Sequence, residues 1–455
     1  MRHTKWQRSA GRRGAPFGDD GRVNGTTGDH DATGASTGVL GLHGWLGRPV
    51  IGVAIVMAAA GFAQFSPTAA LADVAEHFGE LRNGGETIAE QAGLPGTVLG
   101  AGLATIRLAA VFALPLAALA DRFGRRRSLL TWASLGLVVV IAAAGSPGYW
   151  WFVAAFALAR PLLTATDTIA EVMAAEHTGL ADRAKAIALM SAAYGVGAGS
   201  VAVLRGAVGE SLGFRWVFGL AVLPLLAVWL AARMVTEPSR YHARPVAVAG
   251  RRPVLGSVRR GLRGRLGLLA GLTFASALIT GPANTFLFVY AENVLDASTA
   301  LTGTLVVAAA PAGLLGLVVG RYLSDHAGRR PTAAVGLVAL AGAGVLTYSG
   351  TVPALAAGYL LGIFVGSAYA TPTIALATEL FPTSTRASVA GWLVLAGVLG
   401  ATLGLFVAGA VADATDSFGS ALALVCVPAG LTAVLLAFLP ETRGLELEES
   451  APEPA

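Results

Sequence analysis

The sequence predicts an all-α membrane protein in which twelve transmembrane helices form two parallel repeats of six helices. Three observations support this fold class. First, 55% of the 455 residues are hydrophobic and only 13% are charged, whereas about a quarter of the residues of soluble domains are charged. Second, twelve apolar stretches approach the roughly 20 residues that a helix needs to cross the hydrocarbon core. Third, charged residues of the first half recur in the second half at a nearly constant spacing.

The twelve predicted spans are bounded by charged residues or by turns rich in Pro and Gly. In order, they cover residues 49–72, 97–119, 128–145, 149–173, 185–205, 216–235, 266–291, 300–322, 331–349, 354–378, 388–412 and 418–439. Several neighbouring spans are separated by only a few turn-forming residues, such as GSPG at 145–148. We therefore expect one integral bundle.

The polar segments at both ends and in the middle of the chain complete the predicted organisation. Residues 1–48 contain too few large apolar residues to form a core, so we expect a disordered cytoplasmic tail. The first apolar stretch comes too late for a cleaved signal peptide and is expected to be retained. We then expect a six-helix half at 49–235, a basic cytoplasmic linker at 236–265, a second six-helix half at 266–439 and a cytoplasmic tail at 440–455.

The basic residues are concentrated on one side of the predicted membrane. The only Lys or Arg residues in the loops on the opposite side are Arg82, Arg205 and Arg215. The positive-inside rule therefore places both termini in the cytoplasm, with the bundle in the plasma membrane. The net charge of +5 is then explained by topology, and we expect lipid rather than nucleic acid as a partner. No metal or other cofactor is expected, because the seven histidines lack metal-ligand spacing.

An internal repeat organises the charged residues of the loops. Four markers recur 203 or 204 residues further along the chain, namely Asp121 as Asp325, Glu176 as Glu379, Arg183 as Arg386 and Glu237 as Glu441. Each half holds six predicted spans, and because six is even, both halves enter the membrane in the same orientation. Parallel repeats of this kind place a substrate site near the middle of the membrane, between the halves.

The repeated loops resemble a known family. LADRFGRRR at 119–127 and LSDHAGRRP at 323–331 are similar to the signature loop of the major facilitator superfamily. TEPSRY, ATELFPTSTRA and PETRGLELEE resemble segments of its sugar-porter-like branch, which is also called the general substrate transporter branch. The resemblance implies a secondary transporter that moves a small organic solute by alternating access. Gln64 stands where proton-coupled members of that branch often carry an aspartate.

The resemblance also implies a role for the matched charges. In the family, such residues form salt-bridge clusters that latch the two halves on the cytoplasmic side when the cavity opens outward. The residues expected to do so here are Asp121, Arg125, Arg126, Glu176, Arg183, Glu237 and Arg240 in the first half, and Asp325, Arg329, Arg330, Glu379, Arg386, Glu441 and Arg443 in the second. The alternative is that they only anchor helix ends, although acidic residues contribute little to orientation.

Charges inside the predicted spans form the second group of candidates, since a charged side chain at membrane depth normally faces a cavity. Four polar residues occupy one stripe of the fourth span, because their spacing of three or four residues matches the helical period. They are Arg160, Thr164, Asp167 and Glu171. At 1.5 Å per residue, Asp167 lies roughly 14 Å from Glu176, near the midplane. Arg107 reaches a comparable depth in the second span, roughly 21 Å from Asp121.

Two interpretations of these intramembrane charges remain open. Asp167 or Glu171 accepts a proton and the arginines bind an anionic or hydroxyl-rich solute, or an arginine and Asp167 form a structural ion pair. Further residues that could line the same cavity are Gln64, Asn284, Tyr290, Tyr369 and Thr371.

The sequence favours proton-coupled uptake of a sugar, an organic acid or a similar metabolite. The glycine–proline pattern of drug exporters is missing from the fifth span, but efflux of drug-like or metabolite compounds remains the alternative. A non-transporting sensor is a minor alternative, since no sizeable folded extension is predicted. An enzyme is not expected, because no catalytic constellation is found.

Overall fold

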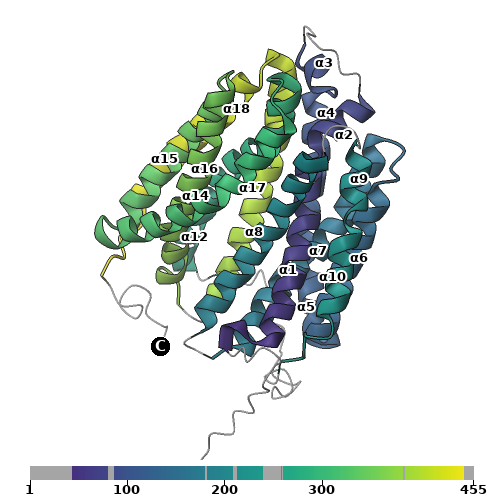
Figure 1. The fold of residues 1–455 in the computed structure, drawn as a ribbon. Coiled ribbons are helices and arrows are strands. Elements are labelled where there is room, and N and C mark those ends of the chain that lie inside the picture. The colour runs from purple at the N-terminus through teal and green to yellow at the C-terminus, as the bar shows by residue number, and fades with distance from the viewer. Residues whose placement is uncertain are drawn as a thin grey trace, which may run out of the picture. The chain divides into compact units, whose positions relative to one another are not determined.

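The computed structural model describes residues 44–79, 87–179, 182–208, 213–238, 258, 260–382 and 385–444. Within these ranges, all regular structure is helical, and twelve helical segments are long and apolar enough to cross a membrane. Figure 1 shows them side by side in one bundle. The predicted fold class is therefore confirmed.

The first half of the bundle contains six spanning segments. They are α1 (Arg48–Ala69), α4 (Gly96–Ala109) continued through η2 (Ala110–Phe112) into α5 (Ala113–Phe123), α6 (Arg125–Ala143), α7 (Tyr149–His177), α8 (Arg183–Val208), and α9 (Gly213–Gly219) followed by α10 (Val222–Ala231). Three short helices complete this half, η1 (Gly44–Leu46), α2 (Leu71–Phe78) and α3 (Ile88–Ala92).

The second half repeats this arrangement. Its six spanning segments are η3 (Arg260–Leu262) with α12 (Arg263–Thr285), α13 (Leu287–Val289) and η4 (Tyr290–Val294), then α14 (Thr299–His326), α15 (Arg329–Thr347), α16 (Val352–Glu379), α17 (Arg386–Thr415), and α18 (Phe418–Leu431) with η5 (Thr432–Phe438). The predicted spans match these segments to within a few residues. Several helices begin earlier than composition suggests, because charged residues such as Arg125 belong to the first helical turn.

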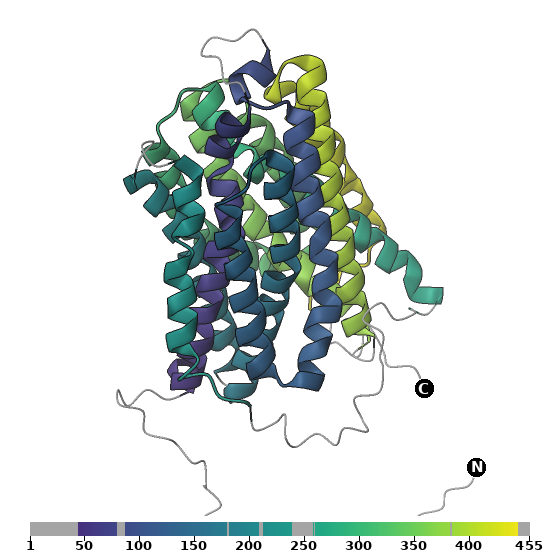
Figure 2. The same cartoon turned by 90° about the vertical axis from the view of Figure 1, so that its right-hand side faces the viewer.

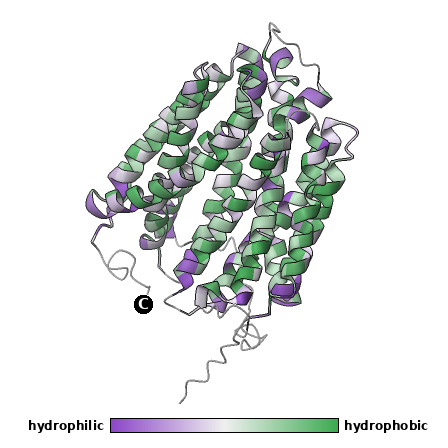
Figure 3. Ribbon diagram, viewed as in Figure 1, coloured by the Kyte–Doolittle hydropathy of each residue, from purple (hydrophilic) through white to green (hydrophobic). Residues whose placement is uncertain are grey.

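The two ends of the bundle differ in charge, and Figure 3 shows hydrophilic residues gathered at the ends with apolar residues between them. We call the end where α5 meets α6 and α14 meets α15 the basic end; Arg125 and Arg329 lie there. We call the other end, where α1 finishes and α17 finishes, the acidic end; it carries Asp73, Glu292 and Asp413.

Small residues allow the spanning helices to approach closely. A Cβ atom at Gly61 of α1 would overlap the backbone carbonyl of Tyr194 on α8, and one at Gly404 of α17 would overlap that of Leu278 on α12. Without a hydrophobic driving force between helices in lipid, such close packing is a main source of association. In the view of Figure 2, α17 runs beside α4 of the other half. There, a Cβ at Gly409 would overlap the carbonyl of Gly96.

Candidate functional site

At the basic end, the repeat forms the same helix cap in each half. Glu237 accepts hydrogen bonds from the backbone N–H groups of Arg125 at 2.7 Å and Arg126 at 3.0 Å. Glu441 accepts the equivalent bonds from Arg329 at 2.9 Å and Arg330 at 3.0 Å. A carboxylate at a helix N-terminus pairs with free N–H groups and with the positive end of the helix dipole. These two carboxylates therefore stabilise the start of α6 and of α15.

The next arginine of each loop, Arg126 or Arg330, donates hydrogen bonds to backbone carbonyls at the end of the last helix of the same half. Arg126 donates to the carbonyl groups of Val235 at 2.7 Å and Ala232 at 2.8 Å. Arg330 donates to those of Leu436 at 2.9 Å and Ala437 at 2.8 Å. Gly124 and Gly328, with φ of 94° and 109°, make the turn before each capped helix. Glycine adopts such a positive φ without steric penalty.

The arginine directly after the turn glycine of each loop, Arg125 or Arg329, binds two carboxylates of its own half. Arg125 lies 3.3 Å from Asp121 and also pairs with Glu176. Arg329 lies 3.0 Å from Asp325 and 3.3 Å from Glu379. Both arginine side chains are largely buried, so these pairs are shielded from water more than ordinary surface pairs.

The remaining predicted gating residues are less tightly placed. Arg183 forms no ion pair within 4.0 Å among the described residues, and Arg386 donates to the carbonyls of Thr378 and Phe381. The backbone N–H of Arg443 donates to Glu441, and Arg240 lies outside the described residues. All these contacts are within one half. Helix capping thus explains the matched carboxylates Glu237 and Glu441, and a latch between the halves stays a prediction for another conformation.

The cap at Glu441 gives a testable expectation for stability. Burial raises the pKa of Glu441, but four backbone N–H donors, those of Arg329, Arg330, Arg443 and Thr442, outweigh it and leave the pKa below its ordinary value. A lowered pKa means that the stabilisation is complete at neutral pH and is lost as the pH falls below about 4.

We expect Glu441→Gln to destabilise the protein by about 1–2 kcal/mol, because a charged acceptor at a helix N-terminus is replaced by a neutral one. Thermal unfolding of the purified protein at pH 7 would measure this. Glu237→Gln should behave alike, and Asp296→Asn, at an exposed position of the acidic end, serves as control. Equal melting temperatures for all three variants and the parent would contradict the capping role.

Deep in the first half, a carboxylate is hydrogen-bonded to an amide from another helix. Gln64 of α1 donates from Nε2 to Oδ2 of Asp167 on α7 at 2.7 Å. Gln64 is buried and Asp167 is half-buried. The second carboxylate oxygen of Asp167, Oδ1, is buried and has no partner among the described residues. A buried polar atom without a partner calls for an explanation, such as a bound water or ion.

Two other members of the predicted stripe on α7 also have a buried polar atom without a hydrogen-bond partner. Arg160 Nε and Thr164 Oγ1 are buried without a hydrogen-bond partner in the described part of the chain. The charge of Arg160 acts on Asp167, on Arg107 of α4 and on Tyr194 of α8, so these groups lie within electrostatic reach of one another. We call Gln64, Arg107, Arg160, Thr164, Asp167 and Tyr194 the polar cluster.

The two arginines of the polar cluster are not neutralised by direct pairing. Among the described residues, neither Arg107 nor Arg160 has a carboxylate oxygen within 4.0 Å. Arg107 lies just before η2, where the helix tightens to a 3-10 turn in the middle of the span.

Glu171, one turn beyond Asp167 toward the basic end, is exposed. Of these two acids, Glu171 is therefore the more exposed.

The predicted cavity residues of the second half are mostly engaged with their own half. The hydroxyl of Tyr290 accepts from the N–H of Gly350 at 2.9 Å, and that of Tyr369 donates to the carbonyl of Leu272 at 3.4 Å. Thr371 donates to the carbonyl of Ser367 one turn earlier. Asn284 lines a small pocket between α12, α15 and α16. The structure does not bring these four residues into contact with the polar cluster.

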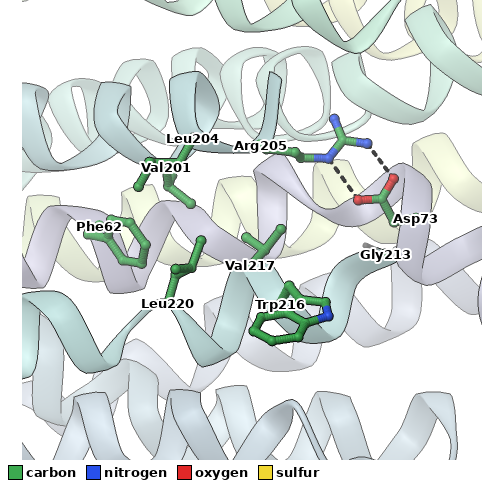
Figure 4. Close-up of a pocket in the computed structure, with 9 residues that line it drawn as sticks. All are labelled: Phe62, Asp73, Val201, Leu204, Arg205, Gly213, Trp216, Val217 and Leu220. Carbon is green, nitrogen blue, oxygen red and sulfur yellow. Dashed lines mark hydrogen bonds and ion pairs between the residues drawn. The ribbon is translucent and has the colours of Figure 1, made fainter. Parts of the chain in front are cut away.

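At the acidic end, a buried arginine joins the halves. Arg205 of α8 donates to both oxygens of Asp73, at 2.8 and 2.5 Å, and to both oxygens of Glu292 in η4, at 2.7 and 2.5 Å. Figure 4 shows Arg205 and Asp73 beside the apolar residues Leu204 and Val217. Thr302 also donates to Glu292, at 2.6 Å. The Arg205 and Glu292 side chains are only 5% and 7% exposed, so this pairing is desolvated.

A second connection lies beside it. Asp413 of α17 accepts from the backbone N–H groups of Gly96 at 2.6 Å and Thr97 at 2.8 Å, and thereby caps α4 of the other half. Asn293 donates to the carbonyls of Ala72 and Ala92. We call Asp73, Arg205, Glu292 and Asp413, which sequence reasoning missed, the acidic-end network. The hydrogen bonds and ion pairs found between described residues of the two halves lie at this end.

Two six-helix repeats, an intramembrane polar cluster and an inter-half network at one end are the features of a multi-pass membrane transporter. The comparison with known families agrees: the sequence model of the Major Facilitator Superfamily matches residues 51–346 and 298–454. The chain belongs to this superfamily.

Solved structures with the same fold include the inward-open xylose transporter XylE from Escherichia coli. It is 18% identical, has a TM-score of 0.67, and the match covers 88% of this chain and 98% of that one. A bacterial homologue of the lysosomal transporter Spinster is 16% identical with a TM-score of 0.61, over 86% and 94% of the two chains.

A curated relative is similar over part of its length only. The class C tetracycline resistance protein of Escherichia coli is 32% identical over 165 residues, which are 36% of this chain and 39% of that protein. The match therefore spans about two fifths of that relative.

Proposed function

We propose that the protein is a proton-coupled secondary transporter that takes up a small organic solute by alternating access. The observation that carries this proposal is the polar cluster. At membrane depth, a half-buried carboxylate is hydrogen-bonded to Gln64 and has one unpartnered oxygen. It lies within electrostatic reach of Arg160, which in turn acts on Arg107. Such groups are costly in a membrane and are typical of proton and substrate pathways.

The proposed orientation follows from charge. The basic end carries the arginine-rich loops of both repeats, so the positive-inside rule assigns it to the cytoplasm together with both termini. The plasma membrane is the proposed location. With this orientation, the increase in exposure from Asp167 to Glu171 leads toward the cytoplasm. Glu171 then serves as an exit relay for the proton.

The acidic-end network supports alternating access. Its contacts hold the halves together at the acidic end, whereas none of the hydrogen bonds and ion pairs found between described residues joins the two halves at the basic end. When the outer side opens, these contacts must break. We propose that the charged groups of the basic end, including Asp121, Glu176, Asp325 and Glu379, then latch the halves on the cytoplasmic side.

Uptake and efflux are both represented among similar proteins. One solved structure with the same fold is described as a D-xylose–proton symporter, with a TM-score of 0.66 and 19% identity. The tetracycline resistance protein, with higher identity over a shorter segment, supports export of drug-like compounds as the second candidate. We favour uptake, because the glycine–proline pattern of drug exporters is missing from the fifth span.

Transport by purified protein in proteoliposomes tests this proposal. The panel contains xylose, lactate, lactamide, benzoate, benzamide, tetracycline and tetraphenylphosphonium. Each compound is tested with and without an inwardly directed proton gradient. We expect accumulation of at least one solute only when the gradient is present. Export driven by the same gradient would favour the second candidate, and binding without movement of any solute would indicate a sensor and contradict both.

A further inference from the structure

We infer that the solute is an organic anion whose carboxylate binds between Arg107 and Arg160, and that it enters together with a proton because Asp167 and the anion share Arg160. This inference rests on the proposed function. It names the class of substrate and explains the direction of coupling from the charges of the polar cluster.

The first argument is the charge of the polar cluster. It contains two guanidinium groups and one carboxylate, and Asp167 is hydrogen-bonded to the neutral amide of Gln64 rather than paired with an arginine. The two arginines act on each other electrostatically. Like charges held together at membrane depth repel each other and are costly unless an anion joins them. A bound carboxylate would supply the missing negative charge.

The second argument is the excess of donors. Arg160 Nε is buried and unpartnered, and Thr164, whose Oγ1 is equally unpartnered, lies one helical turn further along the same face. The planar guanidinium fork matches the two oxygens of a carboxylate. The guanidinium groups and the hydroxyls of Thr164 and Tyr194 offer donors, whereas Asp167 Oδ1 is the free acceptor. This set suits an acceptor-rich ligand better than a cation.

The third argument concerns coupling. When Asp167 is ionised, its charge partly offsets that of Arg160. When Asp167 is protonated, the full charge of Arg160 is available to the anion, so anion binding and proton binding strengthen each other by the same factor. A cationic solute would instead compete with the proton for Asp167, which is the behaviour of an exchanger. The sign of the solute charge therefore decides between symport and exchange.

Other titratable groups around Asp167 do not replace it in this role. Tyr194 of α8 and two residues of α7 itself, Arg160 and Glu171, lie within electrostatic reach of Asp167, and Arg107 of α4 acts on Arg160. From α1 the facing group is the neutral Gln64. The described ionisable residues of α5 and α6 lie at the basic end. Glu171 is the only other acid in this set, so Glu171→Gln is the matched comparison.

Equilibrium binding to the purified full-length protein tests the inference. The probes are lactate, benzoate and gluconate, which stay largely ionised at both pH 5.5 and pH 7.5, together with lactamide, benzamide and gluconamide, tetraphenylphosphonium, and phosphatidylglycerol as an anionic lipid. We expect at least one carboxylate to bind while its amide does not. Its affinity should be about 5- to 100-fold tighter at pH 5.5 than at pH 7.5.

The variants separate the two parts of the inference. Asp167→Asn should bind the carboxylate tightly at both pH values, whereas Glu171→Gln should keep the pH dependence. Arg107→Gln and Arg160→Gln should each weaken carboxylate binding about tenfold or more, and Arg160→Lys should restore it only in part because the fork is lost. Arg215→Gln, an exposed arginine of the acidic end, should bind like the parent protein.

Several results would overturn the inference. The first is that no carboxylate binds, or that phosphatidylglycerol is the only probe that binds. The second is that an amide or tetraphenylphosphonium binds as tightly as the carboxylate. The third is that the affinity for the carboxylate at pH 5.5 is equal to or weaker than that at pH 7.5. Proton-driven accumulation of a neutral solute in the proteoliposome panel would leave the proposed function intact and reject the anion. Absence of any solute movement there would reject the proposed function itself.

Discussion

Asp167→Asn is expected to abolish proton-driven accumulation of the solute while leaving solute exchange intact. Asparagine cannot take up or release the proton, but it keeps an oxygen that accepts the hydrogen bond from Gln64. Exchange returns each half-cycle with solute bound and needs no proton release. The accumulation ratio in proteoliposomes under a proton gradient should therefore fall to about one, whereas counterflow with unlabelled solute inside should continue.

The matched control for this variant is Glu171→Gln. Because Glu171 is exposed and lies one turn closer to the basic end, its loss should slow accumulation without abolishing it. If Asp167→Asn accumulates solute against a gradient with the pH dependence of the parent protein, Asp167 is structural. Equal loss of exchange and of accumulation would instead indicate a folding or solute-binding defect.

Glu292→Gln is expected to shift the protein toward a conformation open at the acidic end. The substitution removes the charge that pairs with buried Arg205 across the halves, and breaking one side of a buried pair costs about 3–5 kcal/mol. About 5.5 kcal/mol suffices to invert a two-state equilibrium from 1:99 to 99:1. Asp413→Asn, which weakens the cap on α4, should act in the same direction.

Cysteine labelling measures this shift. Ala202 is 2% exposed, and its backbone carbonyl faces Gly303 of the other half, so Ala202→Cys should react slowly with a water-soluble maleimide until the acidic end opens. The native Cys426 is buried and can be replaced by alanine beforehand. We expect labelling to rise about tenfold or more in Glu292→Gln and to stay unchanged in Glu76→Gln, which alters an exposed acid of α2. Unchanged labelling in both would show that the network does not hold the acidic end closed.

The spanning segments were predictable because hydropathy over 20 residues reports the membrane directly. The repeat of Asp121 as Asp325 also predicts the two halves. Periodicity further placed Arg160, Thr164 and Asp167 on one face of α7. The same spacing argues against a direct pair between Arg160 and Asp167, because seven residues extend roughly 10 Å along a helix. The structure accordingly shows Asp167 bonded to Gln64.

The acidic-end network was not predictable from the sequence. Asp73, Arg205 and Glu292 lie far apart in the chain, none is repeated in the other half, and each is unremarkable as a single loop or helix-end charge. Only the packing of α2, α8 and η4 brings them together. Conversely, the repeat singled out Glu237 and Glu441 as matched charges but did not predict their role. Each caps a helix that begins more than a hundred residues earlier in the chain, and such a contact has no local sequence pattern.

Proton movement during solute entry tests the central claim most directly. Proteoliposomes would contain the parent protein and a pH indicator, and a solute identified as transported would be added outside without an imposed proton gradient. The account predicts acidification of the interior as the solute enters, and none with Asp167→Asn although that variant still exchanges solute. Solute entry without any pH change, or with alkalinisation of the interior, would contradict it.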